Sequence, residues 1–406
     1  MCAWDHLRSD EPSVGNLSTF VELIDSGAWD WLCVVTAAMG DTAAGRPLFT
    51  RKRYRTVKNS LRALALSGAL AVAVVAGPAP LAYAVGEGPN YGDNGQITTS
   101  KLTTYDQMVS FLKDQDAKQP AMELEVIGQT VKGRDIHLVK YISDPAKPTI
   151  LYLTQQHGNE QLTTEGALQF IKHLGVAKSA AILDGVNILV VPMLNADGAM
   201  GDVNFSLEDY LAKGDRNMTR YNADGVDLNR DHVAKIQPET QALHNNVMRK
   251  YNIDYMIDLH HQGTRSQRDG ELVSGSILYP TTPNAAPAVV EKSKQLGAVV
   301  FDNVDSTGWG HLGKYVGGTA ETISRNGIAV EYGIATLLFE MRGMSDHYLD
   351  GYALGLRSNG YLIKQTVTTL TSTAAAIADG SIDDADTSFW DTLAEQASRG
   401  GEADDE

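Results

Sequence analysis

The chain has few residues that could cross-link it or bind nucleic acid. Its 406 residues include only two cysteines, Cys2 and Cys33, which excludes a disulfide framework as the basis of the fold. Basic residues are also scarce, with 34 lysines and arginines against 50 aspartates and glutamates and a formal charge of −16. A phosphate-binding surface needs a basic excess, so the composition argues against a nucleic-acid partner. The composition of the whole chain, with 43% hydrophobic and 21% charged residues, is ordinary for a globular protein with a large core.

Residues 51–84 have the three parts of a secretory signal peptide. A basic run precedes an almost uncharged stretch rich in Ala, Val and Leu, and Ala82-Tyr83-Ala84 has the small-x-small form of a signal peptidase site. A transmembrane helix is the alternative, but the apolar run is short for a span, contains an arginine and ends in prolines. We therefore expect cleavage of this segment and a secreted, extracellular protein, with association with the cell wall as a further option.

The signal-like segment begins fifty residues into the chain, although such signals are read at the N-terminus. We therefore expect residues 1–50 to be an upstream extension that is not part of the native protein. Residues 85–100 are expected to form a short linker, followed by one folded domain over 101–378. Residues 379–406 hold ten acidic residues and one basic residue, a composition typical of a disordered, solvated tail.

Strand and helix patterns alternate through the central domain, where no internal repeat or linker is visible. Short apolar runs bounded by turns predict strands, and apolar residues at helical spacing predict helices. This alternation favours an α/β sheet covered on both faces, with functional sites in the loops beyond the strand ends. The expected strands are 123–127, 136–141, 149–154, 186–191 and 253–259, and the expected helices include 162–174 and 238–251.

The turn after the strand at 149–154 carries His157 and Glu160. Such a pair offers a nitrogen and an oxygen ligand for Zn²⁺. Chance supplies a His-x-x-Glu in roughly every second chain of this size, so a turn with polar caps is the alternative. A third ligand could come from His260 at the end of a later strand; His261 points to the opposite side of an extended chain, so we expect only one of the two to bind metal. Asp258 could support His260 from behind or cap the loop.

Two further stretches carry polar residues suited to chemistry. The loop over 219–230 contains two arginines and two asparagines, and guanidinium groups suit carboxylates because two parallel N–H donors match two oxygens; a solvated surface loop is the alternative. Glu340 follows a dense apolar strand, where a carboxylate is costly to bury unless it is paired or transfers protons. A surface ion pair between Glu340 and Arg342 is the alternative there.

Taken in chain order, five motifs resemble those of the zinc carboxypeptidase family, the M14-type metallocarboxypeptidases. They are His-Gly-Asn-Glu, Pro-x-x-Asn-x-Asp-Gly, Gly-Val-Asp-Leu-Asn-Arg, Asp-Leu-His and Phe-Glu-Met-Arg. The resemblance extends over roughly residues 101–378, which would then be the catalytic domain. It implies an α/β fold with a mixed eight-stranded sheet flanked by helices on both faces. It also implies one catalytic Zn²⁺ and hydrolysis of a peptide bond next to a free carboxylate.

The resemblance implies a role for each matching residue of the metal site. His157, Glu160 and His260 match the three zinc ligands, which leave a fourth position for water. Glu340 matches the general base that takes a proton from that water and returns it to the leaving amine.

It also implies roles in binding the substrate. Asn229 and Arg230 match the pair that binds the terminal carboxylate of the substrate. An arginine is expected to stabilise the oxyanion, and by its spacing to the Gly-Val-Asp motif Arg220 is our choice, with Arg216 as the competitor.

Departures from the family pattern concern the substrate more than the metal. Asp231 and His232 follow Asn229-Arg230 where the family more often has Asn and an aromatic, and the third ligand is followed by His-Gln-Gly where many digestive members have Ser-Tyr. The tyrosine that covers the substrate has no secure match; Tyr315 lies near the right region, but a core or loop tyrosine is an equal alternative.

Three functions are therefore compared below. The first is a secreted zinc carboxypeptidase acting on peptides or proteins with a free C-terminal carboxylate. The second is an amidopeptidase of the same fold that cuts a peptidoglycan stem peptide, and the third is a binding module without turnover. Every expected type of catalytic residue is present, which favours an enzyme.

Overall fold

A computed structural model of the chain describes residues 20–24, 31–35, 102–206, 208, 212, 218–263, 266–308, 310–343 and 356–398. The chain divides into two units, Met1–Gly77 and Pro78–Glu406. In the first unit, strands β1 (Phe20–Ile24) and β2 (Trp31–Val35) form an antiparallel pair. The segment expected to be a signal peptide lies outside the described residues.

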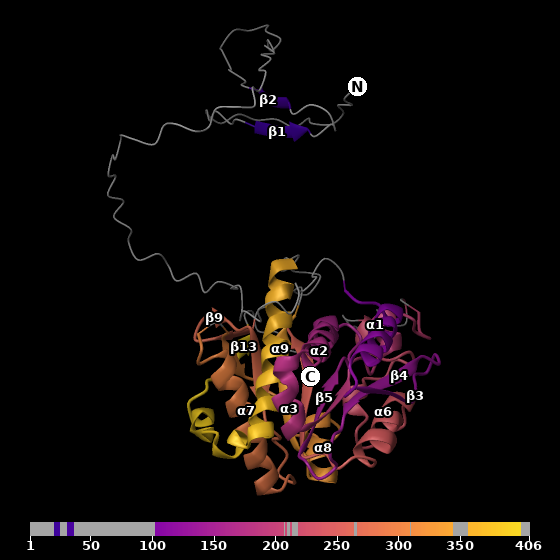
Figure 1. The fold of residues 1–406 in the computed structure, drawn as a ribbon, viewed down its shortest axis with the longest axis vertical. Helices are drawn as coiled ribbons and strands as arrows, with labels where there is room; N and C mark the ends of the chain where they lie inside the picture. Colours follow the sequence, from indigo (N-terminus) through magenta and orange to yellow (C-terminus); the bar gives the residue numbers. More distant parts are fainter. Residues whose placement is uncertain are drawn as a thin grey trace, which may run out of the picture. The chain divides into compact units, whose positions relative to one another are not determined.

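The second unit is built on a mixed sheet of eight strands in the order β11-β10-β12-β7-β5-β6-β4-β3 (Figure 1). Its central strands β12, β7, β5 and β6 run parallel, whereas β4 and β3 continue antiparallel on one side and β10 is antiparallel to β12 on the other. The mixed eight-stranded sheet that the family resemblance implies is thus confirmed. The strands are β3 (Glu123–Gln129), β4 (Asp135–Tyr141), β5 (Thr149–Thr154), β6 (Asn187–Val191), β7 (Tyr255–Gln262), β10 (Gly275–Leu278), β11 (Leu312–Lys314) and β12 (Ala335–Arg342).

Helices cover both faces of this sheet, and short strands form a separate three-stranded sheet in the order β13-β8-β9. The α-helices are α1 (Tyr105–Lys118), α2 (Gln161–Leu174), α3 (Ala180–Gly185), α4 (Ala196–Met200), α6 (Pro238–Leu243), α7 (Pro287–Val304), α8 (Ser324–Tyr332) and α9 (Leu356–Asp379). The short helical turns are η1 (Ala177–Ser179), η2 (Met218–Arg220), η3 (Leu228–Arg230), η4 (His244–Met248), η5 (Ser381–Asp384) and η6 (Thr387–Asp391). The short strands are β8 (Ser266–Arg268), β9 (Glu271–Leu272) and β13 (Ala397–Ser398).

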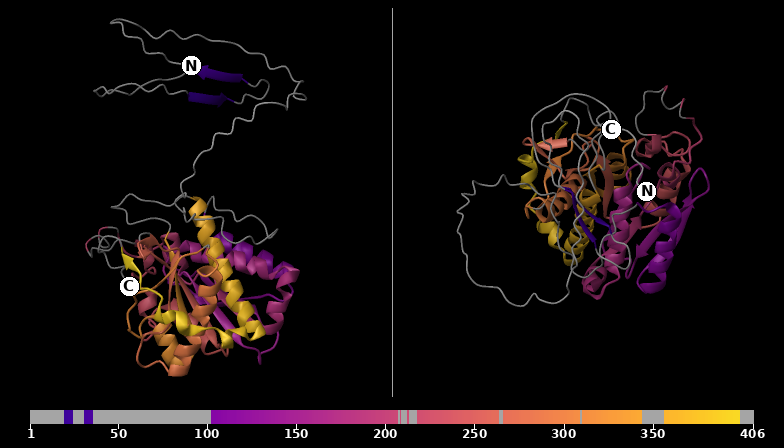
Figure 2. Two further views of the ribbon diagram at one scale, coloured as in Figure 1. Left: turned by 90° about the vertical axis from the view of Figure 1, so that its left-hand side faces the viewer. Right: turned by 90° about the horizontal axis from the view of Figure 1, so that it is seen from above.

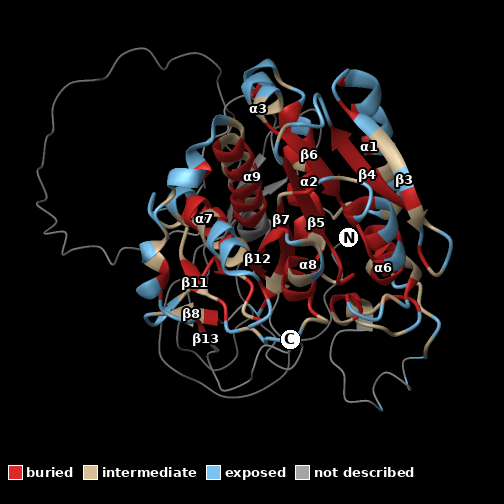
Figure 3. Ribbon diagram, turned by 90° about the horizontal axis from the view of Figure 1, so that it is seen from below, coloured by how far each residue is buried: buried red, intermediate tan, exposed pale blue. Residues whose placement is uncertain are grey.

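Alternation along each strand divides the core between the two faces. In β5, Ile150 and Tyr152 pack with α1, α2, α7 and α9, whereas Leu151 and Leu153 pack with α6, η4 and α8. Figure 2 shows the long helix α9 in yellow lying along the first of these layers, and Figure 3 shows the central strands buried throughout. Both faces of the parallel strands are therefore dry, as their continuous apolar runs predict. Within the described residues, no helix combines the length and hydropathy needed to cross a bilayer.

The C-terminal segment departs from its expected disorder. Residues 381–398 pack on the domain, and the buried Trp390 donates its indole N–H to the carbonyl oxygen of Lys294 at 3.0 Å. A Cβ at Gly297 of α7 would lie 2.3 Å from the Trp390 ring, so this glycine makes room for the indole. Further along, the backbone of Gln396 donates to Lys314 on β11. The prediction of a disordered tail from residue 379 is therefore wrong for residues 381–398. One aromatic patch and backbone pairing along a sheet edge outweigh the acidic composition there.

This packing predicts a measurable contribution of the segment to stability. Trp390→Ala should lower the free energy of unfolding by about 3–5 kcal/mol, the usual cost of truncating a buried large aromatic side chain. Urea unfolding would measure it, with Ile236→Ala, at a side chain that is 65% exposed, as the control expected to change little. Equal midpoints for the two variants would show that the segment does not support the domain.

Candidate metal centre and active site

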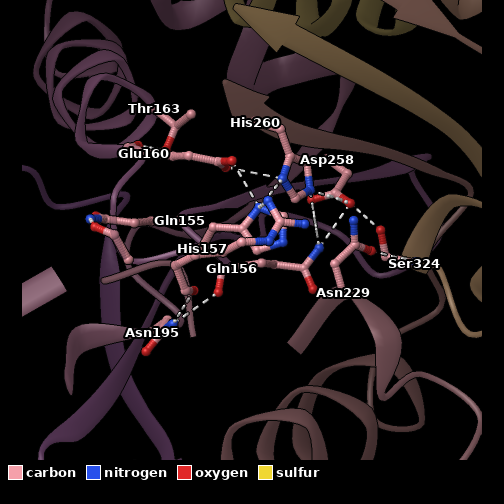
Figure 4. Close-up of polar contacts among 12 residues, drawn as sticks. Gln155, Gln156, His157, Glu160, Thr163, Asn195, Asn229, Asp258, His260 and Ser324 are labelled. Carbon is pink, nitrogen blue, oxygen red and sulfur yellow. Dashed lines mark hydrogen bonds and ion pairs between the residues drawn. The ribbon is translucent and has the colours of Figure 1, made fainter. Parts of the chain in front are cut away.

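The turn between β5 and α2 brings His157 and Glu160 together (Figure 4). Gln155 has a positive φ of 54°, which ends the strand abruptly, and its side chain donates to the carbonyl oxygen of Gly158 at 2.8 Å. Glu160 occupies the N-cap position of α2, and its carbonyl oxygen accepts from the Thr163 hydroxyl at 2.7 Å. The strained turn is thus closed on itself by hydrogen bonds, which fixes the direction of the two side chains.

Gly158 allows the loop before Tyr221 to close over this turn. A Cβ at Gly158 would lie 2.3 Å from backbone atoms of both Gly198 and Thr219, which no other residue could accept without a shift. The Gly158 N–H also donates to the carbonyl oxygen of Arg220 at 3.2 Å. The glycine in His-Gly-Asn-Glu is therefore required by close approach of two backbones, and it places Arg220 beside His157.

His260 on β7 completes a buried group of three potential metal ligands. The Nδ1 atoms of His157 and His260 lie 3.1 Å apart, and they lie 2.8 Å and 3.0 Å from the two carboxylate oxygens of Glu160. Donor atoms around a tetrahedral Zn²⁺ are separated by roughly 3.4 Å, given Zn–N and Zn–O bonds of about 2.0–2.2 Å. The spacing of the group therefore suits one small cation of this kind.

Carboxylates behind both histidines determine which ring nitrogens face the group. His157 Nε2 lies 3.1 Å from Asp227 Oδ1, and His260 Nε2 lies 3.0 Å from Asp258 Oδ2. When a metal ion displaces the Nδ1 protons, each Nε2–H can donate to its carboxylate and each ring can offer its Nδ1 lone pair to the ion. Two lone pairs then converge with the carboxylate of Glu160, an arrangement that a cation between them would stabilise. The chemistry of the donor set thus fits zinc.

The charges of the group follow from burial opposed by close partners. Burial raises the pKa of Glu160, but His157 and His260 outweigh it and hold this pKa well below the usual range. For His260 the balance is reversed, because burial lowers its pKa while Asp258 and Glu160 raise it well above the ordinary value. Burial also raises the pKa of Asp227, and His157 and Arg220 more than offset it, so the pKa of Asp227 falls. The carboxylates are therefore ionised at neutral pH.

Glu340 and Arg220 lie at the same site. Glu340 on β12 is in register with His260 on the neighbouring parallel strand, so the two side chains stand on the same face of the sheet. Both Glu340 and Arg342 are buried, at 6% and 3% exposure, so a surface ion pair between them is wrong. Arg220 donates to Asp227 Oδ2 from Nε at 3.1 Å and from a terminal nitrogen at 2.9 Å. Burial lowers the pKa of Arg220, but Asp227, Glu160 and Glu340 raise it, which keeps the guanidinium charged beside the group.

Asn229 and Arg230 lie on η3, at the edge of the same site. Asn229 Oδ1 accepts from the backbone N–H of Ser324 at 2.9 Å, so the group it can offer a carboxylate is its NH₂. Arg230 is half-buried and donates from one terminal nitrogen to the carbonyl oxygen of Asn229 at 3.0 Å. Asp227 caps this short turn by accepting from the Asn229 N–H at 2.9 Å. One loop therefore carries both the carboxylate that supports His157 and the candidate substrate-binding pair.

Other candidate residues from the sequence lie elsewhere or outside the described residues. Tyr315 is buried with Leu278 and Leu338, so it packs in the core. His261 does not join the three-residue group that could hold a metal. Arg216 lies outside the described residues, which leaves Arg220 as the arginine whose place is known.

Sequence reasoning did not assign roles to several polar residues that the structure brings to this site. Asn195 donates its amide to the carbonyl oxygens of Gln156 and Arg220 at 3.1 Å and 3.2 Å, which joins the two loops. Asp227 belongs to a motif noted in the sequence, but no role was assigned to it. Gln156 and Ser324 both contact Asp258. The available signal for Gln156 was its position next to His157, and the signal for Asp227 was a carboxylate two residues before Asn229. Ser324 gave none.

Comparisons with known proteins agree with this geometry. A family model described as zinc carboxypeptidase matches residues 108–268. A zinc carboxypeptidase of Saccharothrix mutabilis subsp. capreolus is 32% identical over 91 residues, covering 20% of this chain and 21% of the relative. Mouse carboxypeptidase D is 27% identical over 222 residues, covering 52% of this chain and 14% of the relative. The chain thus spans only a small part of the length of these curated relatives.

Solved structures show the same fold at low sequence identity. Carboxypeptidase A of Helicoverpa armigera is 16% identical with a TM-score of 0.51, covering 71% of this chain and 77% of that one. A metallo-carboxypeptidase of Burkholderia cenocepacia is 16% identical with a TM-score of 0.50, covering 66% and 68%. The sheet topology is that of the zinc carboxypeptidase fold, and the buried His-Glu-His group lies at its strand ends. Over residues 108–268 the chain is similar to the zinc carboxypeptidase family.

Proposed function

We propose that this protein is a zinc metallocarboxypeptidase that hydrolyses the C-terminal peptide bond of peptides or proteins. The observation that carries the proposal is the convergence of three ligand atoms with a buried glutamate in register on the next strand. His157, Glu160 and His260 would hold the ion. Bound zinc would supply a Lewis acid that lowers the pKa of a water molecule and polarises the scissile carbonyl.

Glu340 is the proposed general base in this reaction. It takes a proton from the attacking water and returns it to the amine that leaves. Its burial excludes bulk water, so the transferred proton stays within the site. Arg220 is held by Asp227 with its charge toward the group, where it can donate to the oxyanion that forms on the scissile carbonyl.

Asn229 and Arg230 are the proposed receptors of the terminal carboxylate. An amide NH₂ and a guanidinium together offer donors to both carboxylate oxygens. This pair would hold a substrate by its C-terminus and so select the last peptide bond. The proposal also includes secretion directed by residues 51–84, which is supported by the sequence pattern alone.

A digestion experiment tests the proposed substrate class. The full chain, loaded with zinc, would be incubated in parallel with a plain peptide and a muropeptide, and products would be identified by mass. We expect stepwise removal of C-terminal residues from the plain peptide. Cleavage of the peptidoglycan stem without trimming of the plain peptide would support the amidopeptidase alternative, and zinc binding without cleavage of either would support a binding module.

Arg230→Ala should mainly raise KM for peptides with a free C-terminus, by about 10- to 100-fold, because a charge-assisted hydrogen bond contributes about 1.5–3 kcal/mol. Kinetics on matched free and C-terminally amidated peptides would measure this. The exposed Arg249→Ala is the control, since it removes the same charge elsewhere. If Arg230→Ala leaves the preference for a free carboxylate unchanged, Arg230 does not capture it.

A further inference from the structure

Behind the metal group, Asp258 is the centre of a buried hydrogen-bond network (Figure 4). It lies against His260 Nε2, and it accepts from the Gln156 amide at 2.9 Å and 2.8 Å and from the Ser324 hydroxyl. Asp258 therefore accepts from several donors around it, and its position depends on each of them.

The network continues away from the metal through two further buried histidines. The Gln156 Oε1 atom lies 2.7 Å from His232 Nε2. His232 Nδ1 lies 3.0 Å from His244 Nε2, and His244 Nδ1 lies 2.8 Å from the hydroxyl of the half-buried Tyr332. Gln156, His232 and His244 are essentially without solvent exposure. Buried polar side chains are costly unless satisfied, so this chain of contacts has a defined arrangement.

The direction of each hydrogen bond can be worked out from Asp258 outward. Because the Gln156 amide nitrogen donates to Asp258, its oxygen must accept, and His232 must carry its proton on Nε2. His232 Nδ1 is then an acceptor, which requires His244 to donate from Nε2 and to accept at Nδ1 from Tyr332. Burial, opposed by Asp258 and Asp231, lowers the pKa of His232 to about 4, which is consistent with a neutral ring. In this row of hydrogen bonds, every donor therefore points toward Asp258 and the metal group.

We propose that His232 and His244 are positioning residues for the metal ligand His260, acting through Gln156 and Asp258. The inference rests on the proposed zinc centre and adds to it a function for the departure at His232. His232 lies two residues after Arg230, so the loop that would bind the substrate carboxylate also supports the metal ligand. His244 opens the π-helical turn η4, a local irregularity that often occurs at functional sites.

Positioning is favoured over proton conduction by the chemistry of the middle link. The Gln156 amide donates through nitrogen and accepts through oxygen, and it has no proton to pass on without becoming a high-energy imidic acid. A path from Tyr332 to His260 is therefore interrupted at Gln156. The row of hydrogen bonds instead fixes the orientation of each side chain in it. Each neutral histidine has one donor and one acceptor nitrogen, so its neighbours determine which tautomer it adopts.

Zinc affinity of the full chain, measured by competition with a chromophoric chelator, tests the proposal. We expect His232→Phe to weaken zinc binding by about tenfold, since outer-shell partners typically contribute 10- to 100-fold to metal affinity. His232→Gln keeps an N–H near the Nε2 position and should stay within about threefold of the wild type. His137→Phe is the matched control, because it makes the same change at a buried histidine on β4.

The outcomes separate this inference from the proposed function. If the wild-type chain binds no zinc, the proposed function fails and the inference fails with it. If the wild type binds zinc and folded His232→Phe binds equally well, the inference alone is overturned. Should His232→Phe not fold, His244→Leu carries the test, because losing its N–H lets His232 adopt the other tautomer and turn a lone pair toward Gln156. That variant should weaken zinc binding by at least about threefold, and wild-type affinity would overturn the inference.

Discussion

Replacing Glu340 with Gln is expected to lower kcat by about 10²–10⁴-fold, the range that general acid–base catalysis contributes. Glutamine is isosteric, so the packing of β12 should persist, but an amide cannot take a proton from water. Zinc content should be unchanged, because Glu340 is not one of the three grouped ligands. The measurement is turnover of a short peptide by zinc-loaded protein, with metal content determined on the same sample.

A matched control separates this result from general damage. Glu165 on α2 is also buried, and its carboxylate accepts from the Thr103 N–H at 2.5 Å, so Glu165→Gln makes the same change in a comparable environment. We expect Glu165→Gln to affect stability and to leave kcat near wild type. A Glu340→Gln variant with near-normal turnover would rule out the proposed base.

The parts of the fold that the sequence predicts are those with local patterns. Continuous apolar runs at 149–154 and 186–191 coincide with β5 and β6 to within one residue, because parallel strands buried on both faces leave no polar positions. The helix expected over 238–251 is α6 followed by the π-helical η4. Its irregular second half could not be predicted, since it depends on the tertiary contacts of His244 rather than on helix propensity.

In the candidate site, too, the sequence predicts residues that are marked by a local pattern and misses those that depend on tertiary packing. His157 and Glu160 are close in sequence, so a single turn brings them together, and the end of an apolar strand identified His260 as a third candidate. Ser324 and Tyr332 gave no such signal, because they reach the site only through the packing of α8, more than sixty residues after Asp258. The folded segment over 381–398 was missed because composition shows that a tail is acidic but not that α7 offers a surface for Trp390.

Zinc is expected to stabilise the folded chain strongly. Three donors converge in the folded site and are dispersed in the unfolded chain, so zinc binds the native state preferentially and adds about 4 kcal/mol to the unfolding free energy at a thousand times its Kd. Urea unfolding with added zinc and with chelator would measure the difference. Mg²⁺ is the ionic control, since it prefers six oxygen ligands and should stabilise little.

Variants at two glutamates make this prediction specific to the site. Glu160→Gln replaces a charged ligand with a poor one and should remove most of the stabilisation by zinc, because two histidines alone hold the ion weakly. Glu340→Gln should keep the full stabilisation while losing turnover. The pair therefore separates binding of the ion from use of the ion. Equal loss of stabilisation in both variants would mean that Glu340 contributes to the metal shell, and unfolding midpoints that do not respond to zinc in the wild type would exclude the metal centre itself.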